Sequence, residues 1–283
     1  MTRPTDAKPR DASGDALLIC KLLAADPHGF GGVTLASGPG PGRDAFLDCY
    51  KKLAPISSPM ITVPAHVSSD RLEGGLDIAA TLAQGKPIAS RGLIASADQG
   101  VMVLLSAERM SPDKAAHIAA ALDANHNSQF GVIACDESRE DDESIPKILS
   151  ERIAFRVNPD EGVKMLHCEA NVSKGLMQKA EALTLPKSIE DALAETALML
   201  GITSPRALIF AFRVARLNAA LETRESVTDA DATIAAQLIF AHRATQMPVE
   251  QSEAEDQSEE QNNESQSDSS EDRKSTRLNS SHI

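Results

Sequence analysis

The residues from Ser37 to Asp44, SGPGPGRD, are spaced like those of a phosphate-binding loop. In the P-loop pattern G-x-x-x-x-G-K-[ST], backbone N–H groups surround the phosphates, the Lys reaches the outer phosphates and the hydroxyl group ligates Mg²⁺. Here Ser37 replaces the first Gly, whereas Gly42 retains the second. Arg43 takes the position of the Lys, and Asp44 takes that of the Ser or Thr. The spacing of the loop is present, but the residue types that its chemistry needs are replaced.

These replacements make the loop a poor binding site for a polyphosphate. Pro39 and Pro41 have no N–H group, so two backbone donors are lost. Arg43 keeps the positive charge of a Lys without its compact ammonium group, and Asp44 adds a carboxylate that repels phosphate. An ordinary Gly/Pro turn with no nucleotide-binding ancestry is the alternative interpretation. We expect a degenerate, non-functional cofactor site at five residues: Gly38, Gly40, Gly42, Arg43 and Asp44.

The apolar runs near this loop predict strands of a parallel sheet. One run, residues 32–36, comes directly before the loop. The run 100–105 is continuous, which is typical of a strand buried on both faces. An active ATPase of this kind ends that strand in Asp-Glu, for Mg²⁺ and the attacking water, but Leu105 and Ser106 stand here. Glu108 follows two residues later, and we expect it to point elsewhere, so a second hydrolytic motif is missing.

The remaining pattern predicts an α/β unit followed by a helical unit. Further strands are expected at 61–63, 130–135 and 153–157. Helices are expected at 13–25, 45–53, 78–84, 111–123 and 145–152, and then at 163–182, 188–200, 204–222 and 228–245. The stretch 64–77 is expected to be a loop, and 90–94 an inserted turn or hairpin. We divide the chain into a disordered N-terminus (1–12), an α/β domain (13–160), a helical domain (161–247) and a disordered acidic tail (248–283).

Charge and composition limit the class of partner. The chain is 42% hydrophobic, enough for a buried core, and its net charge is −13. Much of this charge lies between Glu250 and Asp272, where acidic residues occur without any basic one and apolar residues are scarce. The rest is only mildly acidic, so we expect no broad nucleic-acid binding. The basic residues 273–283 are interpreted as a cloning or read-through scar.

The cysteines and the N-terminus predict a cytoplasmic protein. Four cysteines (20, 49, 135 and 168) are scattered without C-x-x-C spacing, so we expect reduced, buried thiols and no zinc site. The first ten residues contain no apolar segment, which argues against a signal peptide. No apolar run reaches the roughly 20 residues that a membrane span needs.

Other candidate metal ligands are weak. His28 and His66 are expected to be ordinary loop histidines rather than ligands of a metal or a cofactor. The acidic stretch 136–143 offers carboxylates for weak Mg²⁺ binding, but a solvated loop is favoured. We therefore predict no metal site.

A set of short segments carries a resemblance to a known family. These segments are DPHGFGGV (26–33), PAHV (64–67), RLEGGLD (71–77), LSER (149–152), SPRA (204–207) and VTDAD (227–231). With the degenerate loop and the degenerate strand end, they resemble an AAA+ module, and most closely the N-terminal half of magnesium chelatase D subunits. The resemblance covers residues 11–246.

This resemblance implies a fold and a function. The fold is an AAA+-type parallel sheet flanked by helices and followed by an all-helical lid. The enzyme inserts Mg²⁺ into protoporphyrin IX in (bacterio)chlorophyll synthesis, with a ring ATPase subunit (I) that uses Mg-ATP and a porphyrin-binding subunit (H). This chain is then a non-hydrolysing scaffold, and the family's C-terminal integrin-like domain with its metal site is absent from the sequence. The alternatives are an active AAA+ ATPase, or a MoxR-like chaperone with no tetrapyrrole role.

Two arginines acquire expected roles from the same resemblance. Arg152 lies where the AAA+ family has an arginine finger that reaches the neighbouring subunit's ATP. Arg206 lies at the position of the sensor-2 arginine, at the head of a lid helix. The alternatives are a structural Arg at a helix end and an exposed first-turn Arg. We expect no residue of this chain to catalyse a reaction in a site of its own; the two arginines are candidates to act in a partner's site.

Overall fold

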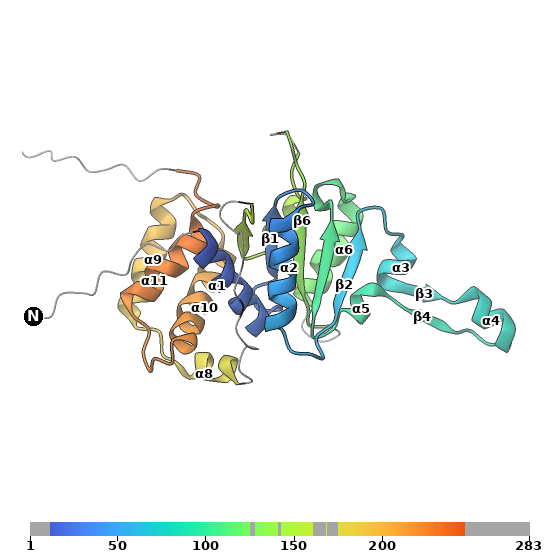
Figure 1. Cartoon of the computed structure of the whole chain (residues 1–283), viewed down its shortest axis with the longest axis horizontal. Coiled ribbons are helices and arrows are strands. Elements are labelled where there is room, and N and C mark those ends of the chain that lie inside the picture. Colours follow the sequence, from blue (N-terminus) through green and yellow to red (C-terminus); the bar gives the residue numbers. More distant parts are fainter. Residues whose placement is uncertain (1–11, 125–127, 141–142, 161–167, 169–174, 247–283) are drawn as a thin grey trace, which may run out of the picture. The chain divides into compact units, whose positions relative to one another are not determined.

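A five-stranded parallel sheet forms the centre of the computed structural model, which describes residues 12–124, 128–140, 143–160, 168 and 175–246 (Figure 1). The strand order is β2-β5-β6-β1-β7. The strands are β1 (Gly32–Ala36), β2 (Met60–Pro64), β5 (Val101–Leu105), β6 (Gly131–Asp136) and β7 (Phe155–Val157). Both faces of β5 and β6 are covered, which explains their continuous apolar sequences. The predicted α/β fold with a parallel sheet is confirmed.

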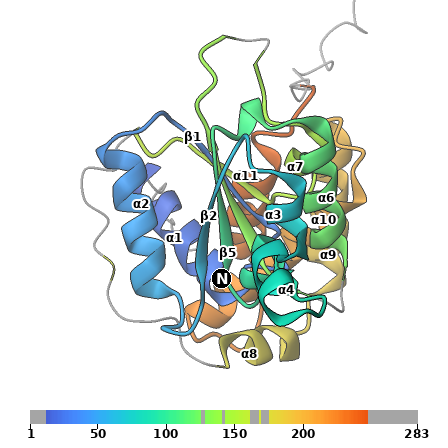
Figure 2. The ribbon, with the colours of Figure 1, turned by 90° about the vertical axis from the view of Figure 1, so that its right-hand side faces the viewer.

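Helices cover both faces of this sheet, and Figure 2 shows α1 and α2 on one side and α6 and α7 on the other. The helices of this part are α1 (Ala12–Ala25), α2 (Pro41–Leu53), α3 (Ser69–Glu73), α4 (Ile78–Gln84), α5 (Leu93–Ser96), α6 (Pro112–Asp123) and α7 (Lys147–Ser150). Side chains alternate along β6: Ile133 and Cys135 pack in the core of α1 and α2, whereas Val132 and Ala134 pack in the core of α6. Two apolar cores therefore hold the sheet from its two sides.

After β7 the described chain is helical. The lid helices are α8 (Leu176–Ala182), α9 (Lys187–Met199), α10 (Pro205–Leu221) and α11 (Asp229–Phe240). Helix α10 contacts the other three and also α1, and its buried residues belong to the same apolar core as α1 and α2. Helices α10 and α11 begin one residue after the predicted starts at 204 and 228. Pro205 takes the first position of α10, and Thr228 with Asp231 forms a capping box at the start of α11. The predicted order of sheet first and helical lid second is confirmed.

The predicted loop 64–77 contains regular structure. It forms α3 and then β3 (Gly74–Leu76), which pairs antiparallel with β4 (Ala89–Arg91). The two strands carry α4 between them as a hairpin insertion (Figure 1). Helix α4 itself has the predicted bounds, because Asp77 accepts a hydrogen bond from the N–H of Ala80 at its start and Gly85 is left-handed at its end.

The prediction of four reduced cysteines is wrong for two of them. Cys49 in α2 and Cys168 form a disulfide across 119 residues, with their Cα atoms 5.7 Å apart. Cys20 and Cys135 are free and buried. The pairing depends on the fold, which brings Cys168 next to Cys49, and the spacing of the cysteines in the sequence does not indicate it.

Several predictions fall on residues that the structure does not describe. These are the N-terminus, most of the helix expected at 163–182, and the acidic tail. The proposed domain boundaries at 160 and 247 therefore stay predictions. Within the described residues, no helix has both the length and the apolar character that a membrane crossing requires.

Candidate functional site

The degenerate loop lies at the carboxyl end of β1 and runs directly into α2. The helix begins at Pro41, with Gly40 in extended conformation as its N-cap. A Cβ atom on Gly38 or Gly40 would meet no atom within 4 Å, so the first half of the loop is open. A Cβ atom on Gly42 would lie 2.6 Å from the carbonyl oxygen of Pro159, so this position packs closely on the chain after β7. The loop is therefore open at Gly38 and Gly40 and closely packed at Gly42.

Arg43, at the position of the P-loop Lys, is bound to a carboxylate of the same chain. Its Nη1 donates to Oε1 of Glu137 at 2.8 Å, and the two side chains are 11% and 21% exposed. Glu137 follows the end of β6, and its Oε2 accepts from the hydroxyl of Ser106 at 3.2 Å. The loop cation is thus neutralised internally, by groups at the ends of two neighbouring strands.

Glu108 also belongs to this cluster, and the expectation that it points elsewhere is wrong. Its side chain is only 1% exposed, and its Oε2 accepts from the backbone N–H of Glu137 at 3.0 Å. Its Oε1 lies 3.3 Å from Nε of Arg109. The cause is Ser106, whose left-handed backbone (φ 47°) turns the chain back toward β6 directly after β5.

The residues present do not fit a Mg²⁺-polyphosphate. Arg43, the cation that would bind a phosphate, is already paired with Glu137, and the carboxylate of Glu108 is bound to the backbone N–H of Glu137. Asp44 is exposed in the first turn of α2 and offers no hydroxyl ligand. Burial raises the pKa of the neighbouring Cys135 thiol to about 11, so this thiol supplies no anionic ligand at neutral pH. We derive no hydrolytic step at this loop.

Arg152 and Arg206 converge on one carboxylate, that of Asp123 at the end of α6. Nε and Nη2 of Arg152 donate to Oδ2 of Asp123 at 2.9 and 2.6 Å. Nη2 of Arg206 lies 3.3 Å from Oδ1 of the same residue. Burial tends to raise the pKa of Asp123, but hydrogen bonds and charges of both arginines outweigh this and lower it. The sheet part and the lid thus each contribute one arginine to a shared acidic residue.

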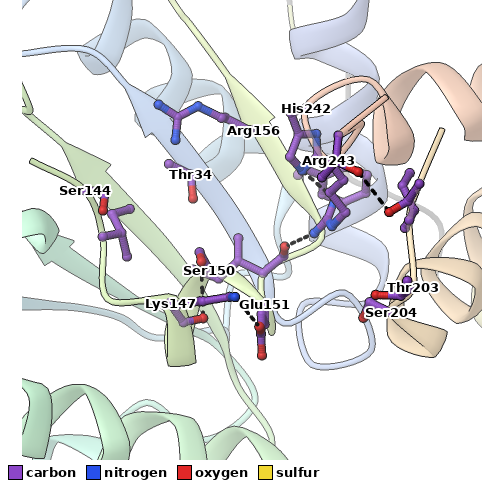
Figure 3. Close-up of a pocket in the computed structure, with 16 residues that line it drawn as sticks. Thr34, Ser144, Lys147, Ser150, Glu151, Arg156, Thr203, Ser204, His242 and Arg243 are labelled. Atoms are coloured by element: carbon purple, nitrogen blue, oxygen red, sulfur yellow. Dashed lines mark hydrogen bonds and ion pairs between the residues drawn. The ribbon is translucent and has the colours of Figure 1, made fainter. Parts of the chain in front are cut away.

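A pocket of about 490 Å³ lies elsewhere, between β7, α7 and the lid. Figure 3 shows Arg156 and Thr34 on its sheet side and Ser204, His242 and Arg243 on its lid side. Arg156 is paired with Asp136 at 3.1 Å. The degenerate loop does not line this pocket, but Glu151 and Ile153 on either side of Arg152 do, and so does Ser204 just before α10. The pocket therefore borders the cluster of Arg152 and Arg206.

The described residues contain no group of three or more His, Cys, Asp or Glu side chains that could hold a metal ion. His28 is half-buried and His66 is exposed. Sequence reasoning missed Glu137 and Asp123 as partners of the predicted arginines. Glu137 follows a buried strand directly, so the rule that polar residues at carboxyl ends of parallel strands meet would have signalled it. Asp123 ends a helix and gives no such signal.

Comparison with known families and proteins identifies relatives. Residues 190–263 match the family model of the AAA lid domain. The chain is 35% identical to the magnesium-chelatase 60 kDa subunit of Cereibacter sphaeroides over 234 residues, which are 81% of this chain and 40% of that protein. It is 28% identical to the magnesium-chelatase 67 kDa subunit of Chlorobaculum tepidum over 89% of this chain and 45% of that protein. The chain thus spans less than half the length of these relatives.

Solved structures share the fold. A full-length MCM homologue from Methanopyrus kandleri superposes with a TM-score of 0.59 at 16% identity, over 83% of this chain and 56% of that one. A candidate ATPase from Cytophaga hutchinsonii gives a TM-score of 0.58 at 14% identity, over 80% and 79%. At these identities the likeness concerns the fold alone, and it agrees with an AAA+-type sheet and lid.

Proposed function

We propose that this chain, which is homologous over most of its length to the magnesium-chelatase 60 and 67 kDa subunits, is the AAA+ part of a non-hydrolysing scaffold subunit of magnesium chelatase. The complex inserts Mg²⁺ into protoporphyrin IX in (bacterio)chlorophyll synthesis. Its ATPase (I) subunit hydrolyses Mg-ATP in a ring with this chain, and the H subunit binds the porphyrin. The assembly works in the cytoplasm.

The ion pair of Arg43 and Glu137 is the observation that carries the non-hydrolysing role. A phosphate entering the loop would have to displace Glu137 from Arg43 and approach Glu108 as well. A hydrolytic site also needs a hydroxyl ligand where this chain has Asp44, and an Asp-Glu pair at the end of β5 where it has Leu105-Ser106. The nearby carboxylate of Glu108 is bound to the backbone N–H of Glu137. The fold of an ATPase subunit is retained, so it can occupy a place in a ring.

The convergence of Arg152 and Arg206 supports a contribution in trans. Arg206 is 42% exposed and Arg152 20% exposed, so both can reach a neighbouring molecule after small side-chain rotations. Each has an exposed apolar residue on its own element: Ile148 is 38% exposed and Ile209 is 51% exposed. Arginines beside exposed apolar residues are typical of protein interfaces. We assign this surface to the partner ATPase subunit and its ATP.

Two measurements on the unmodified protein test the assignment. The chain purified alone is expected to show no ATP hydrolysis, and it is expected to co-purify with the I subunit in the presence of Mg-ATP. Hydrolysis by a clean preparation of this chain contradicts the non-hydrolysing role. A failure to associate under these conditions contradicts the scaffold role.

The in-trans role is tested by Arg152→Ala and Arg206→Ala in the reconstituted complex. Loss of an arginine finger lowers the rate of ATP hydrolysis at its site by about 10³-fold or more. We therefore expect a strong drop in ATP hydrolysis at the contacts between this chain and the I subunit, and in Mg²⁺ insertion by the complex. Lys187→Ala is the control, because Lys187 is a lid cation that is 79% exposed and pairs with Asp191 within the same helix. Wild-type rates in both test variants contradict the proposal.

A further inference from the structure

We infer that Asp123 is a positioning residue, which holds Arg152 and Arg206 together so that both can act on one phosphate group of the partner's nucleotide. This inference rests on the proposed in-trans role of the two arginines. The inference adds Asp123, which is distant in sequence from Arg152 and Arg206 and does not itself contact the reacting groups.

The two arginines share the carboxylate of Asp123. Arg152 binds one oxygen of the Asp123 carboxylate with two nitrogens, and Arg206 approaches the other oxygen. Two guanidinium groups repel each other at this range, so they stay together only around an anion. A carboxylate and a phosphate present similar oxygen geometry to a guanidinium fork. Asp123 therefore arranges the pair, within the free subunit, in the way that a phosphate would need.

Asp123, Arg152 and Arg206 come from three different parts of the fold. Asp123 ends α6, Arg152 follows α7, and Arg206 lies in the first turn of the lid helix α10. Arg152 is also fixed by a hydrogen bond from its Nη1 to the carbonyl oxygen of Ile148 at 2.8 Å. Arg206 has no such second contact among the hydrogen bonds of the described residues. The bond to Asp123 is thus what ties the lid arginine to the sheet arginine.

Asp123 is the last residue of helix α6. A helix carboxyl end carries partial negative charge, so an acidic residue there is unfavourable for the helix. Helix α6 has no basic residue in its last turn that would offset this. The carboxylate and the helix end instead add up to a negative site that attracts both arginines. A role outside the helix explains an Asp at this position better than a role in helix stability.

The test is Asp123→Asn in the complete complex, with ATP hydrolysis followed over a range of ATP concentrations. The substitution keeps the side-chain shape and removes the charge. Displaced arginines would no longer stabilise the transition state, whereas the binding of ATP in the ground state would be unaffected. We therefore expect kcat to fall about 10- to 100-fold with little change in KM. Asp123→Glu, which restores the charge, is expected to recover part of the loss. Asp191→Asn is the matched control, since Asp191 forms an exposed ion pair with Lys187.

A second background separates positioning from mere stability. In a subunit that already carries Arg152→Ala and Arg206→Ala, Asp123→Asn is expected to cause no further drop in kcat. An equal drop in both backgrounds, or an unchanged or raised kcat in the wild-type background, overturns the inference. If the double arginine variant alone leaves kcat unchanged, the proposed function falls and this inference with it. If that variant lowers kcat and Asp123→Asn does not, only the inference falls.

Discussion

At the scale of single residues, the predicted cations are already bound by carboxylates of the same chain. Arg43 is paired with Glu137, and Arg152 and Arg206 are paired with Asp123. The two cases differ in exposure. The pair at the loop is mostly buried, with 11% and 21% exposed side chains, whereas Arg206 and Asp123 are 42% and 38% exposed. The first arrangement supports the proposal that the loop binds no nucleotide, and the second leaves Arg206 exposed, as the proposed role in trans requires.

The buried pair predicts a measurable contribution of Glu137 to stability. Glu137→Ala leaves the largely buried guanidinium of Arg43 without its anion, which we expect to lower the free energy of unfolding by about 1–3 kcal/mol. Urea denaturation measures this change. Glu140→Ala, at an exposed position of the same loop, is expected to stay within about 0.5 kcal/mol of wild type. The Glu137→Ala variant should also remain unable to hydrolyse ATP, and any hydrolysis would contradict our view of the loop.

Residue types and spacing were enough to predict which site chemistry is missing, but not what replaces it. The loss of the Lys, the hydroxyl and the strand-end acid is visible at Arg43, Asp44 and Leu105-Ser106. The partner of Arg43 lies 94 residues away, and that of Arg152 lies 29 residues away. Such pairings depend on how the strands and helices meet in the fold. The position of Glu137 after a buried strand gives a hint of its pairing, whereas nothing near Asp123 in the sequence indicates that it binds Arg152.

At the scale of elements, those with strong local signals were predicted almost to the residue. Helix α4 was predictable from Asp77 and Gly85 at its two ends, and β5 from its continuous apolar run. Helix α3 and strand β3 were missed because they have five and three residues, too short for a period to show. The disulfide of Cys49 and Cys168 was missed for the same reason as the ion pairs, since it depends on tertiary structure.

The start of α11 gives a prediction at this scale. Asp231 is 0% exposed and accepts hydrogen bonds from Asn218 at 2.6 Å and from the backbone N–H of Thr228 at 2.9 Å. Arg224 also donates to it, at 2.6 Å through Nη2. Burial alone raises the pKa of Asp231, but these partners outweigh burial and lower it. We expect Asp231→Asn to lower the free energy of unfolding by about 3 kcal/mol at pH 7.

The same pKa shift fixes the direction of a pH dependence. Because the pKa of Asp231 is lower in the folded state than its ordinary 3.8, its contribution is complete above about pH 4 and is lost as the pH falls below that value. The difference in the free energy of unfolding between wild type and Asp231→Asn, measured by thermal unfolding, should therefore shrink as the pH falls below about 4. Asp229→Asn, at an exposed position of the same helix turn, should cost less than about 1 kcal/mol. A gap that stays constant with pH would contradict this account.

At the scale of the whole described unit, the lid is joined to the sheet by a shared core and by a few long-range polar contacts. Residues of α10 pack in one apolar core with α1 and α2. Arg213 of α10 pairs with Asp26, at the end of α1, across 187 residues. Arg243, which follows α11, reaches the chain directly before β7. The position of the lid matters for the proposed role in trans, because Arg206 and Arg152 share Asp123 only while the lid stays docked.

Arg243 therefore gives the last prediction. Its guanidinium donates to the carbonyl oxygens of Ile153 at 2.6 Å and Ala154 at 2.8 Å, and it lies 5.9 Å from the ring centroid of Phe210. Arg243→Met keeps the length of the side chain but leaves both carbonyl groups without this donor. We expect the free energy of unfolding to fall by about 2–5 kcal/mol, with faster proteolysis between the sheet and the lid. Arg213→Met removes a single half-exposed ion pair and should cost at most about 1 kcal/mol. Undocking of the lid also separates Arg206 from Arg152, so Arg243→Met should lower the ATPase rate of the complex, although Arg243 contacts neither arginine. A stable, protease-resistant variant with a wild-type rate would contradict this link between lid docking and ATP hydrolysis.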